Sequence, residues 1–194
     1  MAVSLRTPSW PWYSTILSET QQPAPVPPAL EEKHLVFQEN QRGVSFGNLF
    51  GTYLAGAHHI TITDPYIRQF FQARNLMEFL ETVAKHKNKD IEVKVRLITS
   101  EDDHPNSQQH DYLNQITESC LAVGIDFTWE LDHTGTLHAR HIVTDHGWKI
   151  LLDRGLDIFQ RYEMGNAFNF ANRLQQFRPC KTFEVTYVKN VTAP

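Results

Sequence analysis

The sequence predicts a mixed α/β fold, in which helices pack against a β-sheet. Two observations favour this class. Segments that alternate apolar and polar residues are separated by segments with the 3.6-residue period of amphipathic helices, which is typical of strands joined by helical crossovers. A β-hairpin towards the carboxyl end adds antiparallel strands, so we expect the sheet to be mixed.

The first predicted elements follow one another from residue 43. We expect a short helix at 43–54 and a strand at 60–63. Asp64 and Pro65 break that strand and begin a helix over 66–87, with Asp64 as the N-cap residue. Asp64 also follows the carboxyl end of a strand, where the ligands of α/β proteins are usually bound.

The clearest strand is expected at 91–99, where apolar and charged residues alternate. A second helix at 111–123 and a strand at 127–131 follow it. After the hairpin we expect a short helix at 167–176 and a last strand at 182–188. The residues predicted for the core of the sheet are Ile62, Val93, Val95, Leu97, Phe127 and Val143.

The predicted hairpin contains the main candidate functional residues. Residues 138–144 alternate as a strand does, 145–147 supply a turn with a glycine, and 148–152 form the return strand. Side chains two apart on a strand share a face, so we expect His138 and Arg140 to point the same way. Such a pair suits proton transfer or phosphate binding. On spacing alone, a strand with a solvated polar face explains the pattern equally well.

The spacing of His138, Arg140 and Asp145 resembles the H-x-K-x4-D motif of phospholipase D-like enzymes, with arginine in the lysine position. Longer segments resemble the MIT C-terminal domain family, whose members have a phospholipase D-like fold. These segments are 40–46, 51–57, 62–68, 74–80 and 154–160. The resemblance covers about 40–189 and implies a mixed β-sheet sandwiched by helices.

The resemblance also implies partners. One eukaryotic member acts in cytokinesis, where the domain binds membrane phospholipids and dimerises. Bacterial relatives include the C-terminal part of Lon-like ATPases of BREX phage-defence systems, and residues 138–145 resemble this branch more closely. The expectations are a homodimer, an ATPase as partner or parent chain, and nucleic acid or anionic lipid as ligand.

An enzyme with the H-x-K-x4-D motif uses one histidine as nucleophile and a second to protonate the leaving group, so each site needs two motifs. This chain has one, and Leu-Leu-Asp at 151–153 stands where Gly-Ser or Gly-Thr usually follows. We predict a site without catalysis that holds phosphate through His138, Arg140, Arg68 and Arg154. The alternative is a homodimeric phospholipase D-type phosphodiesterase acting through His138, with Asp145.

Weaker groups of residues leave alternatives open. His58, His59 and Asp64 lack the spacing of a known metal motif, so we predict no metal. Arg154 and Asp157 flank a glycine, either as a structural pair that pins the loop or as ligand contacts. A late basic group is either a solvated face or a set of phosphate contacts, and consists of Arg173, Arg178 and Lys181.

Composition limits the remaining possibilities. A net charge of -4 excludes a broadly basic nucleic-acid binder but not a local basic patch. The chain has no phosphate-binding P-loop, so it is not itself an ATPase, and no cofactor is expected. It has no run of 18 apolar residues and no signal-peptide pattern, and the two cysteines, Cys120 and Cys180, suit a reducing compartment. These observations predict a cytoplasmic protein.

The N-terminal part differs from the rest. Residues 21–29 are rich in proline, as extended linkers are. Ahead of them, Trp10 and Trp12 belong either to a disordered tail or to a short anchor that docks on another surface. We predict a tail and linker at 1–35, cleaved rapidly by proteases near 23–29, and a single domain at 36–194.

Overall fold

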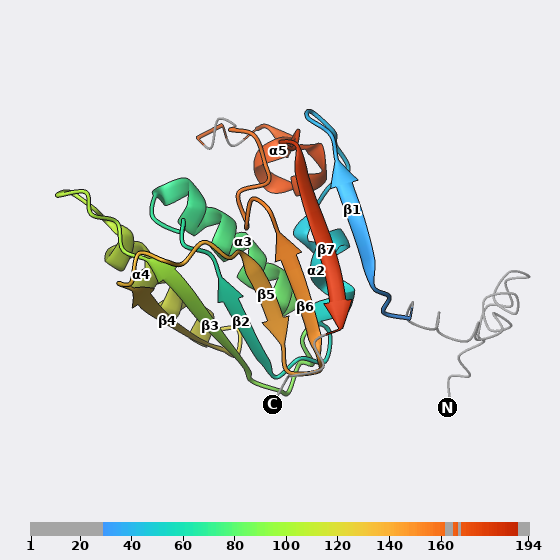
Figure 1. Cartoon of the computed structure of the whole chain (residues 1–194), viewed down its shortest axis with the longest axis horizontal. Coiled ribbons are helices and arrows are strands. Elements are labelled where there is room, and N and C mark those ends of the chain that lie inside the picture. Colours follow the sequence, from blue (N-terminus) through green and yellow to red (C-terminus); the bar gives the residue numbers. More distant parts are fainter. Residues whose placement is uncertain (1–28, 162–164, 167, 190–194) are drawn as a thin grey trace, which may run out of the picture.

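A computed structural model describes residues 29–161, 165–166 and 168–189. One sheet forms its centre, and its seven strands lie in the order β1-β7-β6-β5-β2-β3-β4 (Figure 1). β2, β3 and β4 are parallel neighbours, and the other strands pair antiparallel. The predicted mixed α/β class is confirmed. The predictions for Trp10, Trp12 and the protease-sensitive linker fall on 1–28, outside the described residues.

The elements agree in kind with most of the predicted ones. They are β1 Lys33–Phe37, α2 Phe46–Leu54, β2 His59–Thr63, α3 Phe70–His86, β3 Val93–Ser100, α4 Gln109–Leu121, β4 Ile125–Asp132, β5 His141–Thr144, β6 Trp148–Leu152, α5 Phe170–Arg173, the 3₁₀ turn η1 Gln175–Phe177 and β7 Phe183–Lys189. β1 was not predicted. It pairs with β7, and Phe37 stacks on Phe183 with ring centres 4.5 Å apart.

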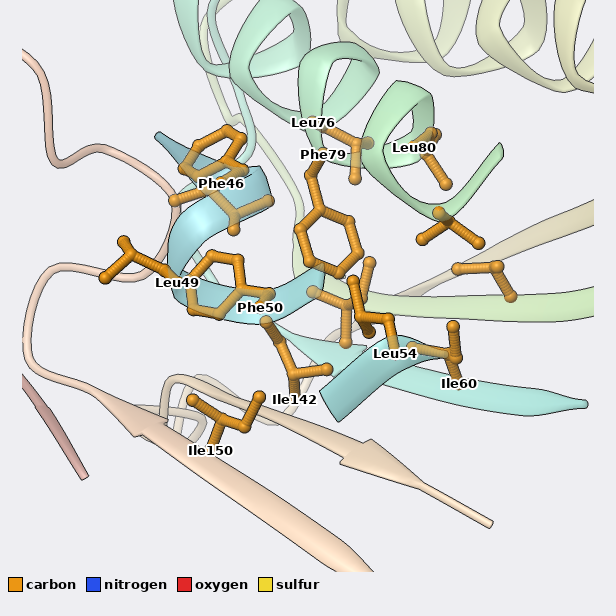
Figure 2. Packing of buried hydrophobic residues seen from close by; sticks show 14 of the residues in the cluster. Phe46, Leu49, Phe50, Leu54, Ile60, Leu76, Phe79, Leu80, Ile142 and Ile150 are labelled. Carbon is orange, nitrogen blue, oxygen red and sulfur yellow. The ribbon is translucent and has the colours of Figure 1, made fainter. Parts of the chain in front are cut away.

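The helices α2, α3 and α4 all cover the same face of the sheet. The crossovers from β2 through α3 to β3 and through α4 to β4 both connect adjacent parallel strands, and right-handed crossovers place both helices on one side. Figure 2 shows Phe46 and Phe50 of α2 beside Phe79 of α3, over Ile142 and Ile150 of the sheet. These aromatic rings are 5.7 to 6.2 Å apart and form the centre of one continuous core.

Within the described residues, the opposite face of the sheet has no covering layer, and we call it the open face. Lys94 and Arg96 of β3 are exposed there, and Leu151 of β6 is 40% exposed. Helices were expected on both faces of the sheet, and within the described residues they cover one face only. The prediction that Val143 lies in the core is wrong, because the inward positions of β5 are Ile142 and Thr144 and Val143 points to the open face.

Two predicted helices are shorter than expected. α3 begins at Phe70, where the Gln72 side chain accepts a hydrogen bond from the Gln69 backbone N–H at 2.9 Å. Asp64 is not its N-cap, since that carboxylate binds other backbone groups. Of the helix expected at 167–176, only α5 and η1 form. None of the helices in the described part of the chain is long and apolar enough to cross a membrane.

Candidate functional site

One end of the sheet collects most of the predicted site residues. The parallel strands β2 and β3 finish there, directly before Asp64 and Glu101. β5 runs antiparallel to β2, so its beginning lies at the same end and brings Arg140 there. β6 also finishes there, before Asp153 and Arg154. Open α/β sheets commonly bind ligands outside the carboxyl ends of their strands, so this end is the candidate site.

A hollow of about 310 Å³ opens at this end, between the loops that follow β2, β3 and β4. His138, Tyr66 and Arg68 line it, so the structure brings two of the predicted phosphate ligands to one cavity. Its other charged or titratable lining residues are Glu101, Asp103, Asp132 and His133. With three carboxylates against one guanidinium, the interior of the hollow opposes a phosphate at neutral pH.

His138 and Arg140 precede β5 instead of lying within it, because the strand begins at His141. The Arg140 carbonyl still accepts a hydrogen bond from the Leu152 backbone N–H at 3.0 Å. The two side chains have different surroundings, however. His138 is exposed and lines the hollow, whereas Arg140 is half-buried and lies against Tyr66.

Tyr66 orients two of the predicted phosphate-binding arginines. The guanidinium carbon of Arg140 lies 4.2 Å from the centre of the Tyr66 ring, and that of Arg68 lies 5.8 Å from it. Arg140 also donates to the carbonyl of Asp153, and Arg68 Nε donates to the carbonyl of Pro65 at 3.2 Å. The Arg140 Nε is buried and has no hydrogen-bond partner among the described residues. Guanidinium groups fixed in this way can bind an anion at small entropic cost.

The buried Asp64 connects the loops after β2 and after β6 at this end of the sheet. It is 3% exposed, and its carboxylate accepts hydrogen bonds from the backbone N–H groups of Tyr66 and Leu156 at 3.1 and 3.2 Å. Burial raises the pKa of Asp64 above its usual value, although these two bonds and the Arg140 charge oppose that shift. Asp64 thus positions Tyr66 and the loop after β6, and contributes to the site indirectly.

Arg154 and Asp157 do not form the structural pair that was one of the two alternatives for these residues. Arg154 Nε donates to the carbonyl of Thr182 at 2.6 Å, and Asp157 forms an ion pair with Lys181 at 2.8 Å. Each therefore fastens the loop after β6 to the start of β7. Arg154 remains exposed at the same end of the sheet as Arg140, so a role in phosphate binding stays a prediction.

The late basic group does not act as one unit. Arg178 is 1% exposed and forms a bidentate ion pair with Glu78, so it is neither solvated nor available to phosphate. Lys181 pairs with Asp157, and Arg173 is exposed at the end of α5. Nothing in the spacing of residues 78 and 178 indicated their contact, because it depends on the path of the chain between them.

Asp145 lies at the opposite end of β5 from His138 and Arg140. Its carboxylate accepts hydrogen bonds from the backbone N–H of His58, at 3.2 Å, and contacts His59 Nδ1 at 3.4 Å. It therefore closes the start of β2 and does not orient His138 or bind Arg140. His58 and His59 are likewise separated from Asp64 by the length of β2. The described residues contain no cluster of three or more His, Cys, Asp or Glu side chains arranged to hold a metal ion.

Comparisons with known proteins bear on this architecture. The family described as the phospholipase D-like domain at the C-terminus of MIT matches residues 43–189. The chain belongs to this MIT C-terminal domain family. The mouse protein named MIT domain-containing protein 1 is 32% identical over 165 residues, which cover 81% of this chain and 62% of the mouse protein. The chain thus spans less than two thirds of that relative.

Family membership gives the strand-end site its context. In this MIT C-terminal domain the match covers the hollow and the Tyr66 group, while β1 precedes it. The resemblance of residues 138–145 to the bacterial branch stays a prediction.

Proposed function

We propose that this MIT C-terminal domain is a non-catalytic interaction domain that binds a phosphate-bearing anion at the carboxyl ends of its strands. One observation carries the proposal. The site holds a single histidine of the motif, His138, beside two arginines, Arg68 and Arg140, that Tyr66 orients. A phosphodiesterase of this class requires a histidine from a second motif as acid, whereas phosphate binding requires only oriented cations. The other histidine of the hollow, His133, belongs to no such motif, and its Nδ1 lies 3.2 Å from the Glu101 carboxylate.

The charges around the hollow favour a particular place for the anion. Glu101, Asp103 and Asp132 repel phosphate inside the hollow, while Arg140 lies outside its lining. An extended ligand with several phosphates, such as an anionic lipid surface or a nucleic acid, can contact Arg140 and Arg154 without entering the hollow. Because few cations take part, we expect weak binding that depends on salt.

Binding of the full chain to vesicles containing phosphatidylserine, and to DNA and RNA, tests this proposal. Arg140→Ala should weaken binding about tenfold, as expected for the loss of one charge-assisted contact. Raising the salt from about 50 to about 200 mM should weaken it further. Arg96→Ala is the matched control, since it removes an arginine from the open face that is paired with Glu130 at 2.6 Å.

Two results would contradict the proposal. Absence of binding to vesicles, DNA and RNA at low salt would make the domain a protein–protein adaptor with structural arginines. Cleavage of a simple phosphodiester by the purified chain, abolished by His138→Ala, would establish the phosphodiesterase instead. The exposure of His138 beside the hollow leaves room for a second copy of that residue, as this alternative requires.

The assembly and biological setting remain predictions of the sequence. For the homodimer, light scattering at micromolar concentration should give about twice the chain mass of 22.5 kDa, and the chain mass itself would exclude it. For a role in BREX phage defence with a Lon-like ATPase as partner or parent chain, the neighbouring genes are decisive.

A further inference from the structure

The strand β4 forms one edge of the sheet, beside β3 (Figure 1). It pairs with β3 along all eight of its residues, and no other strand in the described part of the chain pairs with it. Proteins commonly protect such edges with short strands, proline or lysine, because free backbone groups can recruit another chain. β4 is long and contains neither proline nor lysine. Its free edge is therefore a candidate for pairing with a further strand.

The free edge of β4 carries a regular row of backbone donors and acceptors. The Val93 N–H of β3 donates to the Gly124 carbonyl at 3.2 Å, which sets the phase of the parallel ladder. Because backbone groups alternate in direction along a strand, those of Phe127, Trp129 and Leu131 point away from β3. No described residue forms a hydrogen bond with them. An extended chain laid beside β4 can bind these groups, as in recognition by β-strand addition.

The face of β4 that packs against α4 offers apolar contacts to such a chain. Trp129 is half-buried, and its ring centre lies 5.2 Å from that of His110 on α4. Leu121 follows His110 by three helical turns, so both lie on the stripe of α4 that faces β4. Leu121 is 69% exposed. Apolar side chains of an added strand would pack beside Trp129 and Leu121.

The other face of β4 is acidic. Asp126, Glu130 and Asp132 share it, because alternate residues of a strand lie on one face. Glu130 is paired with Arg96 of β3 at 2.6 Å, whereas Asp126 and Asp132 form no ion pair with a described residue. Two copies of β4 side by side would bring like charges together, so a second copy of this chain fits the edge poorly. A strand with basic residues at alternate positions fits it instead.

The hollow of the candidate site lies at the carboxyl end of this edge. Asp132, the last residue of β4, lines it together with Glu101 and Asp103. The excess of carboxylates that opposes a phosphate in the hollow favours a cation. A lysine or arginine side chain of an added strand that extends past Leu131 can reach it. The edge and the hollow thus form one continuous surface.

We propose that β4 binds an extended basic segment of a partner protein as an additional antiparallel strand, with one basic side chain in the hollow. Apolar residues of the segment alternate with the basic ones and contact Trp129. Backbone hydrogen bonds provide the affinity, while the acidic face and the hollow select the sequence. Antiparallel pairing is the more stable of the two directions. This site goes beyond the proposed function, because it requires neither a phosphate nor Arg140.

The charge requirement is tested with a fluorescein-labelled peptide, Lys-Val-Lys-Val-Lys-Val-Lys, whose anisotropy reports binding to the full chain. Asp103→Asn should weaken binding about threefold to fivefold, because one exposed charge contact in the hollow is lost. Asp90→Asn is the matched control, since Asp90 is an exposed carboxylate before β3, at the opposite end of the sheet, and it should leave binding unchanged. A peptide with glutamate in place of lysine should not bind.

N-methylation of the peptide tests the backbone pairing. In an antiparallel pair, the residue opposite Trp129 lies on the same face and directs its N–H to β4, so the valines supply the donors. Methylating the valine nitrogens should therefore abolish binding, whereas methylating the lysine nitrogens should change it less than about twofold. The reverse pattern would mean a parallel strand at the same edge. Equal effects of both modifications would overturn the pairing.

Amide hydrogen exchange locates the added strand. The amides of Phe127, Trp129 and Leu131 should exchange rapidly in the free protein and slowly with the peptide, because they gain partners. Those of Thr128 and Glu130 already bond to β3 and should change little.

The remaining outcomes decide against the inference. If the peptide does not bind, the edge site fails, while the proposed function depends on its own vesicle and nucleic-acid tests. If the peptide protects amides of β1 instead, the opposite edge of the sheet is the site. If Asp103→Asn weakens binding but no amide of β4 is protected, the hollow takes a cation without strand addition.

Discussion

Arg178, just before β7, forms a bidentate ion pair with Glu78, in the middle of α3. Arg178 Nη2 and Glu78 Oε1 are 2.9 Å apart. Arg178 is 1% exposed, so this pair takes a full charge out of water. Pairs of this kind are costly to break because the charge that remains is buried and has lost the partner that neutralised it.

Glu78→Gln should therefore destabilise the domain by about 3 kcal/mol or more, measured by urea unfolding at neutral pH. Glu81→Gln is the control, one turn along α3, because its pair with Lys85 is exposed on both sides and should contribute less than about 1 kcal/mol. Equal effects of the two substitutions would show that burial does not strengthen the Glu78 pair.

The same pair predicts a dependence on pH. Burial alone raises the pKa of Glu78, but hydrogen bonds from Arg178 and Gln175 outweigh it, and the pKa lies below its usual 4.5. The folded state therefore binds fewer protons than the unfolded state near this pH. The resulting stability is present above pH 4.5 and is lost as the pH falls through the lower native pKa. Unfolding midpoints of the parent chain and Glu78→Gln should converge on acidification.

Substituting alanine at Gly155 and at Gly135 distinguishes the cost of a left-handed backbone from the cost of a steric clash. Both have positive φ, +60° and +67°, but a Cβ on Gly155 would meet Asp64 Oδ2 at 2.0 Å, whereas Gly135 has open space. Gly135→Ala should cost about 1 kcal/mol for the left-handed backbone. Gly155→Ala should cost at least about 2 kcal/mol more, because the Asp64 carboxylate must leave its backbone donors. Similar melting temperatures of the two variants would rule out the contact with Asp64.

Asp145→Ala should affect stability and leave ligand binding unchanged. The substitution removes the acceptor of the His58 backbone N–H, and we expect a loss of about 1 kcal/mol. Because Asp145 lies at the far end of β5, vesicle binding should match that of the parent chain. A large loss of vesicle binding without a loss of stability would show that Asp145 does take part in ligand binding.

His141 should titrate below its usual pKa of 6.5, because burial lowers that pKa and the positive charge of Lys149 lowers it further. As the pH falls below 6.5, His141 is protonated in the unfolded chain before it is protonated in the folded chain, so the folded state loses stability. Proton NMR of the imidazole should show the low pKa, and Lys149→Ala should raise it. Lys85→Ala, on the helix side, should leave it unchanged.

The sequence was sufficient for elements whose pattern is local. The helix at α3 and the strand at β3 were found because their apolar residues repeat over three or more turns or pairs. β1 was missed because five residues with a half-buried face carry little signal, and its pairing with β7 is not visible along the chain. The phase of β5 was misjudged by one residue, which moved Val143 to the open face.

The candidate site was predicted in part for a similar reason. A motif spacing pointed to His138 and Arg140, which both lie at one end of the sheet, but they precede β5 and have different surroundings instead of sharing a strand face. It misplaced Asp145, because a strand between two motif residues carries them to opposite ends of the sheet. The role of Tyr66 depends on its contact with Arg140, 74 positions away in sequence, between the loop after β2 and the segment before β5, which only the folded chain brings about.

The pairing of β1 with β7 joins an early part of the domain to its last strand. His34 Nδ1 bonds Thr186 Oγ1 at 2.8 Å across 152 positions. During synthesis β1 is made first, yet its only strand partner is made last among the described residues. Until then, its apolar residues Leu35 and Phe37 have no sheet to join. Translation therefore sets the moment at which this domain can close, and a nascent chain interrupted before β7 presents an unpaired strand to chaperones and proteases.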